Sequence, residues 1–184
     1  MSKLFTTTAL LAALALPAQA VQPAEGETLA DSQTYTYWLL DAIKSLDPAK
    51  NTDVEGSDVL RQLFEGLMNE DATGAMIPGV AESHQESEDG LTHTFTLRDA
   101  KWSNGDPVTA QDFVFAWQRV VNPETASEYA WFLELMNIQN ATQIVAGEMT
   151  PDQLGVRAVD DKTLEVKLTT RTPYFLKTLS HATT

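Results

Sequence analysis

The sequence contains no cysteine among its 184 residues. Without cysteine the chain can hold neither a disulfide framework nor the lipid-modified cysteine that anchors bacterial lipoproteins. Beyond the first twenty residues it also has no apolar run long enough to cross a bilayer as a helix. What the sequence lacks therefore excludes a disulfide scaffold and a lipoprotein, and no membrane span is predicted after residue 20.

Basic residues are also scarce, since 12 Lys and Arg stand against 26 Asp and Glu, a net charge of −14. One of the basic residues is Lys3, so the chain after residue 20 keeps 11 of them and has a net charge of −15. Nucleic acids and anionic membrane surfaces need a basic face on the proteins that bind them. We therefore expect neither as a partner.

The first twenty residues have the pattern of a signal peptide. Lys3 gives a positive start, Leu4 to Leu16 is largely apolar, and Ala18-Gln19-Ala20 has the A-x-A form of a cleavage site. A retained anchor is the weaker alternative, because the apolar run is short and contains three threonines. We expect cleavage that leaves Val21 first, and export, which in a bacterium with two membranes means the periplasm.

Catalytic and cofactor motifs are missing as well. The sequence has no G-x-S-x-G elbow, no Walker A loop and no G-x-G-x-x-G turn, so acyl transfer, nucleotide hydrolysis and dinucleotide binding lack support. The histidines His84, His93 and His181 include no i, i+4 pair, and the strand pattern predicts that His93 faces solvent. We expect no metal and no cofactor.

Acidic residues could in principle supply the carboxylate pair of a glycoside hydrolase. Glu86, Glu88 and Asp89 lie in a turn-rich stretch, however, and Asp160-Asp161 lies in a predicted hairpin. Both positions are typical of solvated turn residues. The sequence therefore favours a protein that is not an enzyme, with an exported hydrolase as the alternative.

Short strands and helices alternate along the chain without an internal repeat. The patterns predict strands at Ser32–Leu40, at Thr92–Leu97 and in two runs joined at Asp160-Asp161, turns at Asn69–Gly74 and Ser87–Gly90, and helices after a Ser57 cap, after a Thr109 cap, over 127–136, over 141–146 and after Pro173. This order predicts a mixed α/β or α+β fold.

The stretch Phe95 to Val121, FTLRDAKWSNGDPVTAQDFVFAWQRVV, is the most ordered of these patterns. It predicts a half-buried strand, a turn and then a helix in which Thr109 and Asp112 form a capping box. Apolar residues at helical spacing, among them Trp117, predict a core face rather than the wall of a pocket. Asn122-Pro123 predicts the end of the helix.

The last residues, LTTRTPYFLKTLSHATT, begin a helix at Pro173 and carry the apolar side chains of Tyr174, Phe175, Leu176 and Leu179. No partner for this apolar segment follows it in the sequence. Complete domains more often end in a capped helix or a paired strand. We therefore expect that the chain is truncated.

Five stretches together resemble the N-terminal part of the periplasmic oligopeptide-binding proteins. They are SLDPAK, VLRQLFEGLMNED, IPGVAES, FTLRDAKWSNGDPVTAQDFVFAWQRVVNPETAS and LGVRAVDDKTLEVKLTTRTPYF, and the match covers nearly all of Leu29 to His181. Members of this family are the substrate-binding components of ABC peptide importers, and murein tripeptide-binding proteins are among them. The resemblance implies that Thr109 and Trp117 belong to the scaffold.

For the fold, the resemblance implies an incomplete periplasmic binding protein of type II. It implies a signal peptide at 1–20, an N-terminal segment of lobe I at 21–64 and the small second domain of the family at 65–184. The remaining lobes would be missing. The chain alone would then bind peptide weakly or not at all, because half of a clamp loses most of its enclosure.

For the site, the resemblance implies that peptide is added as a strand beside Thr52-Asp53-Val54, with the ring of Tyr129 against the ligand. Main-chain pairing accepts many side chains. The partners implied are a peptide and the permease subunits of an inner-membrane transporter, bound by a monomer. Because Thr52 and Asp53 are unusual for a broad oligopeptide binder, Asp53→Ala is expected to alter ligand choice. A murein tripeptide or dipeptide carrier and a remnant that binds nothing are the alternatives.

Overall fold

The computed structural model describes residues 26, 28, 31–32 and 34–184. The expected signal peptide and the cut before Val21 lie outside these residues. The chain forms two units, Met1–Trp38 and Leu39–Thr184, and all the helices and strands that the structure describes belong to the second. No helix of the described residues is long and apolar enough to cross a membrane.

The prediction of a strand at Ser32–Leu40 was wrong, since none of the described residues of that stretch forms a strand. Tyr35, Trp38 and Leu40 are more than four-fifths exposed. Aromatic and β-branched residues favour a strand mainly through packing against neighbouring strands. No strand of the described residues pairs with this stretch, so its aromatic and β-branched side chains have no neighbouring strand to pack against.

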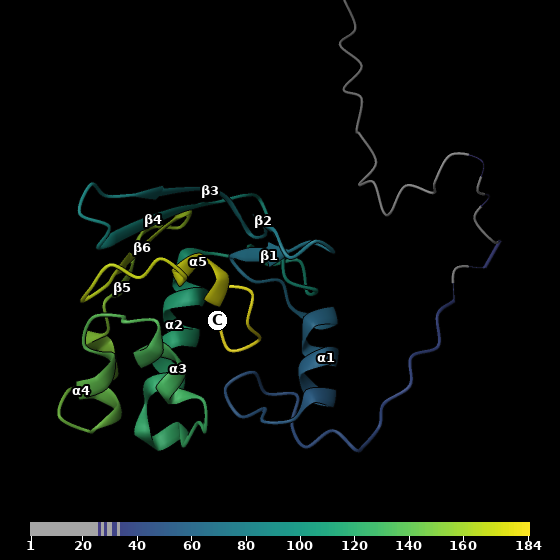
Figure 1. Ribbon diagram of the computed structural model, residues 1–184, viewed down its shortest axis with the longest axis horizontal. Helices are drawn as coiled ribbons and strands as arrows, with labels where there is room; N and C mark the ends of the chain where they lie inside the picture. Colours follow the sequence, from purple (N-terminus) through teal and green to yellow (C-terminus); the bar gives the residue numbers. More distant parts are fainter. Residues whose placement is uncertain (1–25, 27, 29–30, 33) are drawn as a thin grey trace, which may run out of the picture. The chain divides into compact units, whose positions relative to one another are not determined.

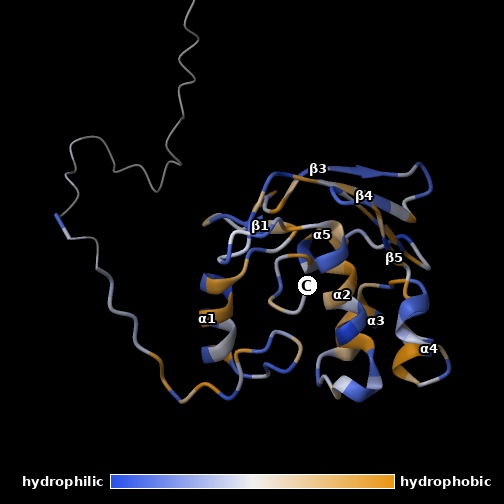
Figure 2. Cartoon of the chain, turned by 180° about the vertical axis from the view of Figure 1, so that it is seen from behind, coloured by the Kyte–Doolittle hydropathy of each residue, from blue (hydrophilic) through white to orange (hydrophobic). Residues whose placement is uncertain are grey.

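An antiparallel sheet of four strands organises the second unit, in the order β3-β4-β6-β5. The strands are β3 (Ala81–Glu86), β4 (Thr92–Leu97), β5 (Val156–Asp160) and β6 (Thr163–Lys167), so the predicted strand at 92–97 and the hairpin at Asp160-Asp161 are confirmed. In Figure 1 the sheet lies across the top, with α2 (Ala110–Val121) and α5 (Phe175–Thr178) below it. β3 at one edge is largely hydrophilic (Figure 2).

The core lies between the sheet and α2. Trp117 of α2, Phe95 of β4 and Phe175 of α5 are its largest fully buried side chains. The capping box of Thr109 and Asp112 is confirmed, with the Asp112 carboxylate accepting the Thr109 N–H at 2.7 Å. Trp117 is part of the core, and α2 ends directly before Asn122-Pro123, both as predicted.

The prediction that His93 faces solvent was wrong, because its side chain is 3% exposed. Alternate residues of a strand share a face. His93 therefore lies on the same side of β4 as Phe95 and Leu97, which are buried with it. The alternation was visible in the sequence, but this residue was assigned to the wrong face.

The region before the sheet contains α1 (Val54–Leu63) and the hairpin of β1 (Met68–Glu70) and β2 (Met76–Pro78). The turn predicted at Asn69–Gly74 is confirmed within this hairpin. The helix begins earlier than expected, because Asp53 rather than Ser57 is its N-cap. It also ends earlier, since Phe64 is already extended.

Short helices complete the unit. They are η1 (Pro123–Thr125), α3 (Ala130–Leu135), α4 (Ala141–Val145) and η2 (Pro151–Gln153), followed by α5. Of these, α3, α4 and α5 agree with the predicted helices to within a few residues, whereas η1 was not predicted. The apolar segment after Pro173 does have partners within the chain, since Phe175 and Leu179 are buried in the core. These two side chains are covered within the chain, whereas Tyr174 of the same segment is 44% exposed.

Candidate functional site

The loop before α1 carries the segment predicted to bind peptide, and Asp53 organises it. The Asp53 backbone is extended, with φ −112° and ψ 155°, and its carboxylate accepts the N–H of Gly56 at 2.6 Å. It also accepts the N–H of Lys44 at 3.2 Å. The side chain thus accepts one of the N–H groups that the start of a helix leaves unpaired. It also bonds to Lys44, earlier in the same loop.

The two neighbours of Asp53 are arranged differently from each other. Thr52 is half-buried and lies in the loop, whereas Val54 is the first residue of α1 and its side chain is 71% exposed. The extended backbone therefore ends at Asp53. A strand added here would meet the loop at Thr52 and Asp53 and the start of the helix at Val54.

Asn51 holds this loop from within. It is 6% exposed, and its amide donates to the Ser45 carbonyl at 3.1 Å and to the Asp53 carboxylate at 3.3 Å. The hydroxyl of Ser57 donates to the side-chain oxygen Oδ1 of Asn51 at 2.8 Å. Asn51 thus connects Ser45, at one end of the loop, with Asp53 and Ser57 at the other.

Tyr129 lies elsewhere, at the start of α3, in a cluster of rings. Its ring centroid is 5.7 Å from that of Trp131 and 5.3 Å from that of His181, and His181 also lies 4.5 Å from Phe132. Tyr129 is half-buried, while Trp131 is 52% exposed. The cluster joins α3 to the residues after α5.

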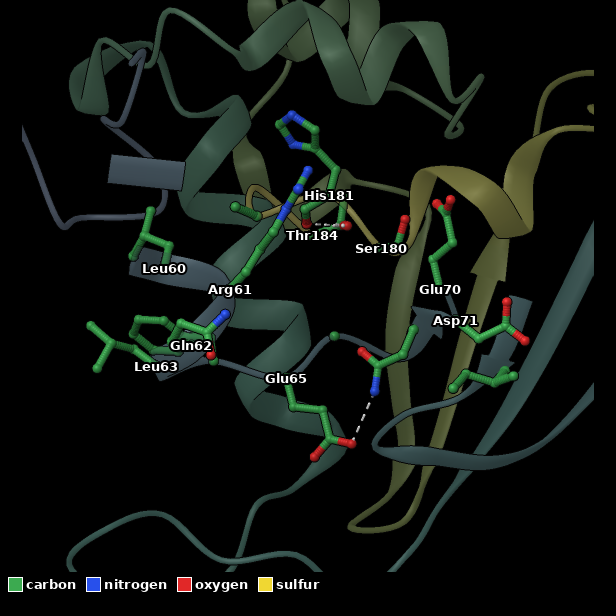
Figure 3. Close-up of a pocket in the computed structure, with 15 residues that line it drawn as sticks. Leu60, Arg61, Gln62, Leu63, Glu65, Glu70, Asp71, Ser180, His181 and Thr184 are labelled. Carbon is green, nitrogen blue, oxygen red and sulfur yellow. Dashed lines mark hydrogen bonds between the residues drawn. The ribbon is translucent and has the colours of Figure 1, made fainter. Parts of the chain in front are cut away.

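An open pocket of about 810 Å³ lies beside this cluster. Its wall is formed by the end of α1, the β1–β2 hairpin and the residues after α5, and Figure 3 shows the Arg61 side chain extending toward the ring of His181. Burial, and then the charge of Arg61, lower the pKa of His181. Both effects disfavour the charged form of His181, which lies against the rings of Tyr129 and Phe132.

The predicted site has two parts, the segment Thr52–Val54 and the ring of Tyr129, and no described contact joins them. Asp53 lies at the start of α1, and the pocket adjoins the end of the same helix. A helix of ten residues is about 15 Å long. Among the described contacts, Tyr129 is connected to the pocket through the ring of His181, a residue for which no sequence pattern indicates this role.

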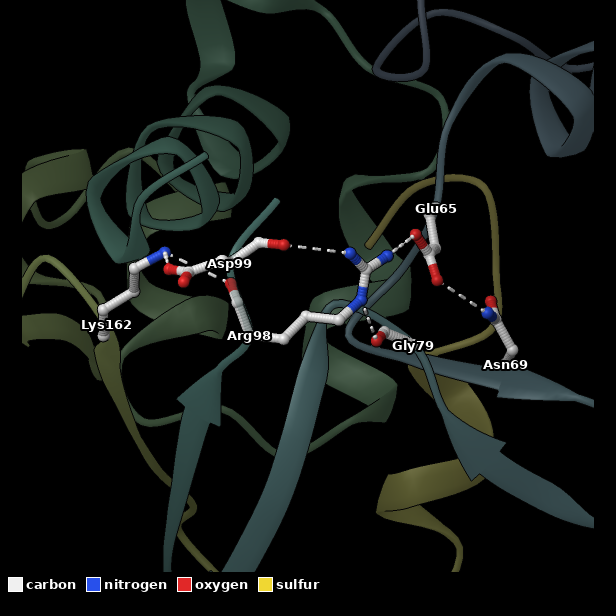
Figure 4. A network of polar contacts seen from close by, with 6 residues as sticks. All are labelled: Glu65, Asn69, Gly79, Arg98, Asp99 and Lys162. Atoms are coloured by element: carbon white, nitrogen blue, oxygen red, sulfur yellow. Dashed lines mark hydrogen bonds and ion pairs between the residues drawn. The ribbon is translucent and has the colours of Figure 1, made fainter. Parts of the chain in front are cut away.

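A polar network fixes the hairpin beside the pocket (Figure 4). The Arg98 guanidinium forms an ion pair with Glu65 and donates to the Gly79 carbonyl at 3.1 Å. Lys162 donates to the Arg98 carbonyl at 3.2 Å and pairs with Asp99 at 3.1 Å. The network links the residues after α1 to the sheet, and it contains no arrangement that would hold a metal. Among the described residues there is no group of three or more potential metal ligands.

Two other residues of the region, Asp47 and Arg119, were not predicted as functional. Arg119 of α2 donates from Nη1 to Asp47 Oδ1 at 2.6 Å and from Nη2 to Asp47 Oδ2 at 2.5 Å. The sequence pattern assigns Asp47 to a turn with Pro48, and it assigns no role to Arg119. The pair is 72 positions apart in the sequence, so no local pattern could reveal it.

The fold and sequence define the class of this chain. Residues 75–184, more than half of it, match the family of bacterial extracellular solute-binding proteins, family 5 Middle. The chain belongs to this family, which confirms the resemblance found in the sequence.

The curated relatives include named peptide-binding proteins. The chain is 46% identical over 172 residues to the periplasmic murein peptide-binding protein MppA of Escherichia coli, covering 93% of this chain and 32% of the relative. It is 49% identical over 160 residues to the periplasmic oligopeptide-binding protein OppA of the same species, covering 86% of this chain and 29% of the relative. The chain thus spans about a third of the length of the curated relatives it matches.

Solved structures agree with the sequence comparison. The substrate-binding domain of an oligopeptide ABC transporter from Bacillus anthracis superimposes with a TM-score of 0.82 at 47% identity, over 85% of this chain and 30% of that one. Haemophilus influenzae OppA in complex with the peptide RPPGFSPFR superimposes with a TM-score of 0.74 at 48% identity. The superposition covers 76% of this chain and 27% of that one. The mixed α/β fold is therefore that of part of a family 5 solute-binding protein, as predicted.

Proposed function

We propose that this chain is part of a periplasmic solute-binding protein that captures peptides for an ABC importer. The observation that carries the proposal is the 49% identity to a protein named as a periplasmic oligopeptide-binding protein. Binding in such a protein needs no reactive side chain, so we propose that it is not an enzyme. Its partners are a peptide and the permease subunits of the inner membrane, and it acts as a monomer after removal of residues 1–20.

The proposed peptide site combines backbone and aromatic contacts. The peptide main chain is added as a strand at Thr52, Asp53 and Val54, and the ring of Tyr129 forms a side wall. Two features support this. The backbone at Asp53 is extended, and the first N–H groups of a helix, including that of Val54, have no acceptor within the helix.

The domain boundaries also stand as a proposal. Residues 21–64 would form the N-terminal segment of lobe I, and 65–184 the small second domain. The family match, residues 75–184, falls within the second of these segments.

A murein peptide carrier is the second candidate, and the 46% identity to MppA favours it. The two candidates differ in the peptide that is preferred, so one titration compares them. The protein at its native length is titrated with tetraalanine and with the murein tripeptide in a calorimeter. Saturable binding of either peptide supports the proposal, and the tighter of the two selects the candidate. Absence of binding by both would overturn it.

A further inference from the structure

The loop before α1 is joined to the core by one bidentate ion pair. The two N–H groups of the Arg119 fork meet the two oxygens of the Asp47 carboxylate at 2.6 and 2.5 Å. Both side chains are about two-thirds buried, with 34% and 31% exposed. A planar guanidinium that forms two hydrogen bonds to a carboxylate fixes the orientation of the two groups as well as their distance. A lysine ammonium, which acts as a point charge, does not fix the orientation.

The Arg119 end of this pair is rigid. Arg119 lies in α2 between residues of the core, because Trp117, Val120 and Val121 are at most 2% exposed. The helix itself is capped at Thr109 and packs on β5 and β6. Arg119 therefore presents its guanidinium from a fixed position relative to the sheet.

The Asp47 end governs the loop. The Asp47 backbone carbonyl accepts the N–H groups of Lys50 and Asn51, both at 2.9 Å, and its Oδ1 accepts the N–H of Ala49 at 3.1 Å. Asn51 then bonds to the carboxylate of Asp53. A continuous series of hydrogen bonds thus runs from Arg119 to the segment proposed to pair with peptide.

Apolar packing between α1 and the core is sparse among the described residues. Leu60 is the one apolar side chain of α1 that is buried, whereas Val54 and Leu63 are 71% and 61% exposed. Ala49 adds a single small side chain to the core. Because apolar packing is sparse here, the ion pair carries a large part of the positioning.

We propose that Arg119 and Asp47 are positioning residues that fix the loop 45–53 on α2 and so place the peptide-pairing segment. The inference rests on the proposed function for its link to binding, but not for the position of the loop. It predicts that loss of either partner loosens the loop without unfolding the domain.

Hydrogen exchange tests the position of the loop directly, without any peptide. Two variants are compared, Arg119→Met and Asp47→Asn, of which the second keeps an oxygen for the Ala49 N–H. In both we expect the amides of Lys50 and Asn51 to exchange at least about fivefold faster. The exchange rates of amides in β4 and β6 should be unchanged. The double variant should show no further increase, because the two residues act as one unit. Arg157→Met is the matched control, since Arg157 forms a bidentate pair with Glu165 on the sheet.

Peptide affinity tests the link to binding. With the protein at its native length and tetraalanine as probe, Arg119→Met should weaken binding at least about fivefold, Arg119→Lys should weaken it less, and Arg157→Met should leave it unchanged. Unchanged exchange in both variants would overturn the inference. So would faster exchange with unchanged affinity. If the unmodified protein binds no peptide, the proposed function fails, and the exchange rates alone decide whether the pair positions the loop.

Discussion

The carboxylate of Asp53 accepts the backbone N–H of Gly56 at 2.6 Å, so the residue predicted to face a peptide also starts α1. Its second oxygen meets Lys44 and Asn51. The Asp53 side chain thus caps a helix and is also proposed to select the ligand. Substitutions can distinguish the effect on stability from the effect on ligand choice.

Asp53→Ala should lower the free energy of unfolding by about 1 kcal/mol, because the helix loses its N-cap. Asp53→Asn keeps an oxygen for Gly56 and so keeps the N-cap, but its amide nitrogen cannot accept from Lys44 and Asn51, so it should cost less than Asp53→Ala, ~0.5 kcal/mol. Urea unfolding of the 184-residue chain measures both. If the side chain also contacts ligand, Asp53→Asn changes peptide preference at nearly normal stability. Equal stability loss in the two variants would contradict the capping role.

The paired histidines of β3 and β4 should make stability depend on pH. His84 Nε2 and His93 Nδ1 lie 2.9 Å apart, and this contact accommodates one proton. Burial lowers the pKa of both below the usual 6.5, against a smaller opposite effect of Glu86. The unfolded chain therefore binds protons first, and the stability present above pH 6.5 is lost as the pH falls through the folded pKa values.

The measurement is the free energy of unfolding in urea at pH 7.5 and pH 5, which should be lower at pH 5. His93→Leu, of similar volume, should reduce this difference, because it removes one titrating group and the buried Nε2 that has no hydrogen-bond partner. Burial also lowers the pKa of His181, so this residue accounts for part of the pH dependence that remains in the variant. An equally steep pH dependence in His93→Leu would show that the pair is not responsible.

Gly79 is required by a close approach of backbone to backbone. A Cβ at this position would lie 2.4 Å from the Gly66 carbonyl oxygen and 3.0 Å from that of Leu67. Gly79→Ala should therefore cost about 1–3 kcal/mol, since neither neighbour is a side chain that can turn away. Thermal unfolding measures the cost.

Gly105→Ala is the matched control, because nothing lies within 4 Å of its added Cβ and only the left-handed backbone, with φ +94°, opposes it. That strain is worth about 1 kcal/mol. A larger loss at Gly105 than at Gly79 would contradict the clash.

Tyr129 should contribute to peptide affinity through its ring rather than its hydroxyl. Tyr129→Ala is expected to weaken the binding of tetraalanine about tenfold in the protein at its native length, and Tyr129→Phe only slightly, because an aromatic face is worth roughly 1 kcal/mol or more. Phe115→Ala controls for loss of an exposed aromatic, since Phe115 lies on the solvent side of α2. Equal affinity in Tyr129→Ala and the unmodified protein would remove this residue from the site.

The sequence predicted best where the signal was local. The start of α2 is determined by the capping box of Thr109 and Asp112, which are three residues apart. Its end is determined by the ring of Pro123. Both signals are local, so the helix was predicted correctly. At α1 the predicted cap was Ser57, but the structure uses Asp53, four residues earlier. The choice depends on the bonds of Asn51 and Lys44 in the folded loop, which no local pattern reveals.

The rest of the candidate site depends on contacts between distant segments. Asp47 and Arg119 meet across 72 positions, and Tyr129 meets His181 across the chain from α3 to the residues after α5. Periodicity and capping signals describe neighbours in sequence, so they identify the elements but not these pairs. The resemblance to a family supplied Tyr129, but it did not supply the residues around it.

Native mass spectrometry of the protein, purified without denaturation from the periplasm of its source organism, tests the central claim most directly. The account predicts a polypeptide that begins at Val21 and carries, in part of the population, the additional mass of a short peptide that is released on activation. A polypeptide that still begins at Met1, or one that carries no peptide and acquires none when tetraalanine or murein tripeptide is added, would contradict it.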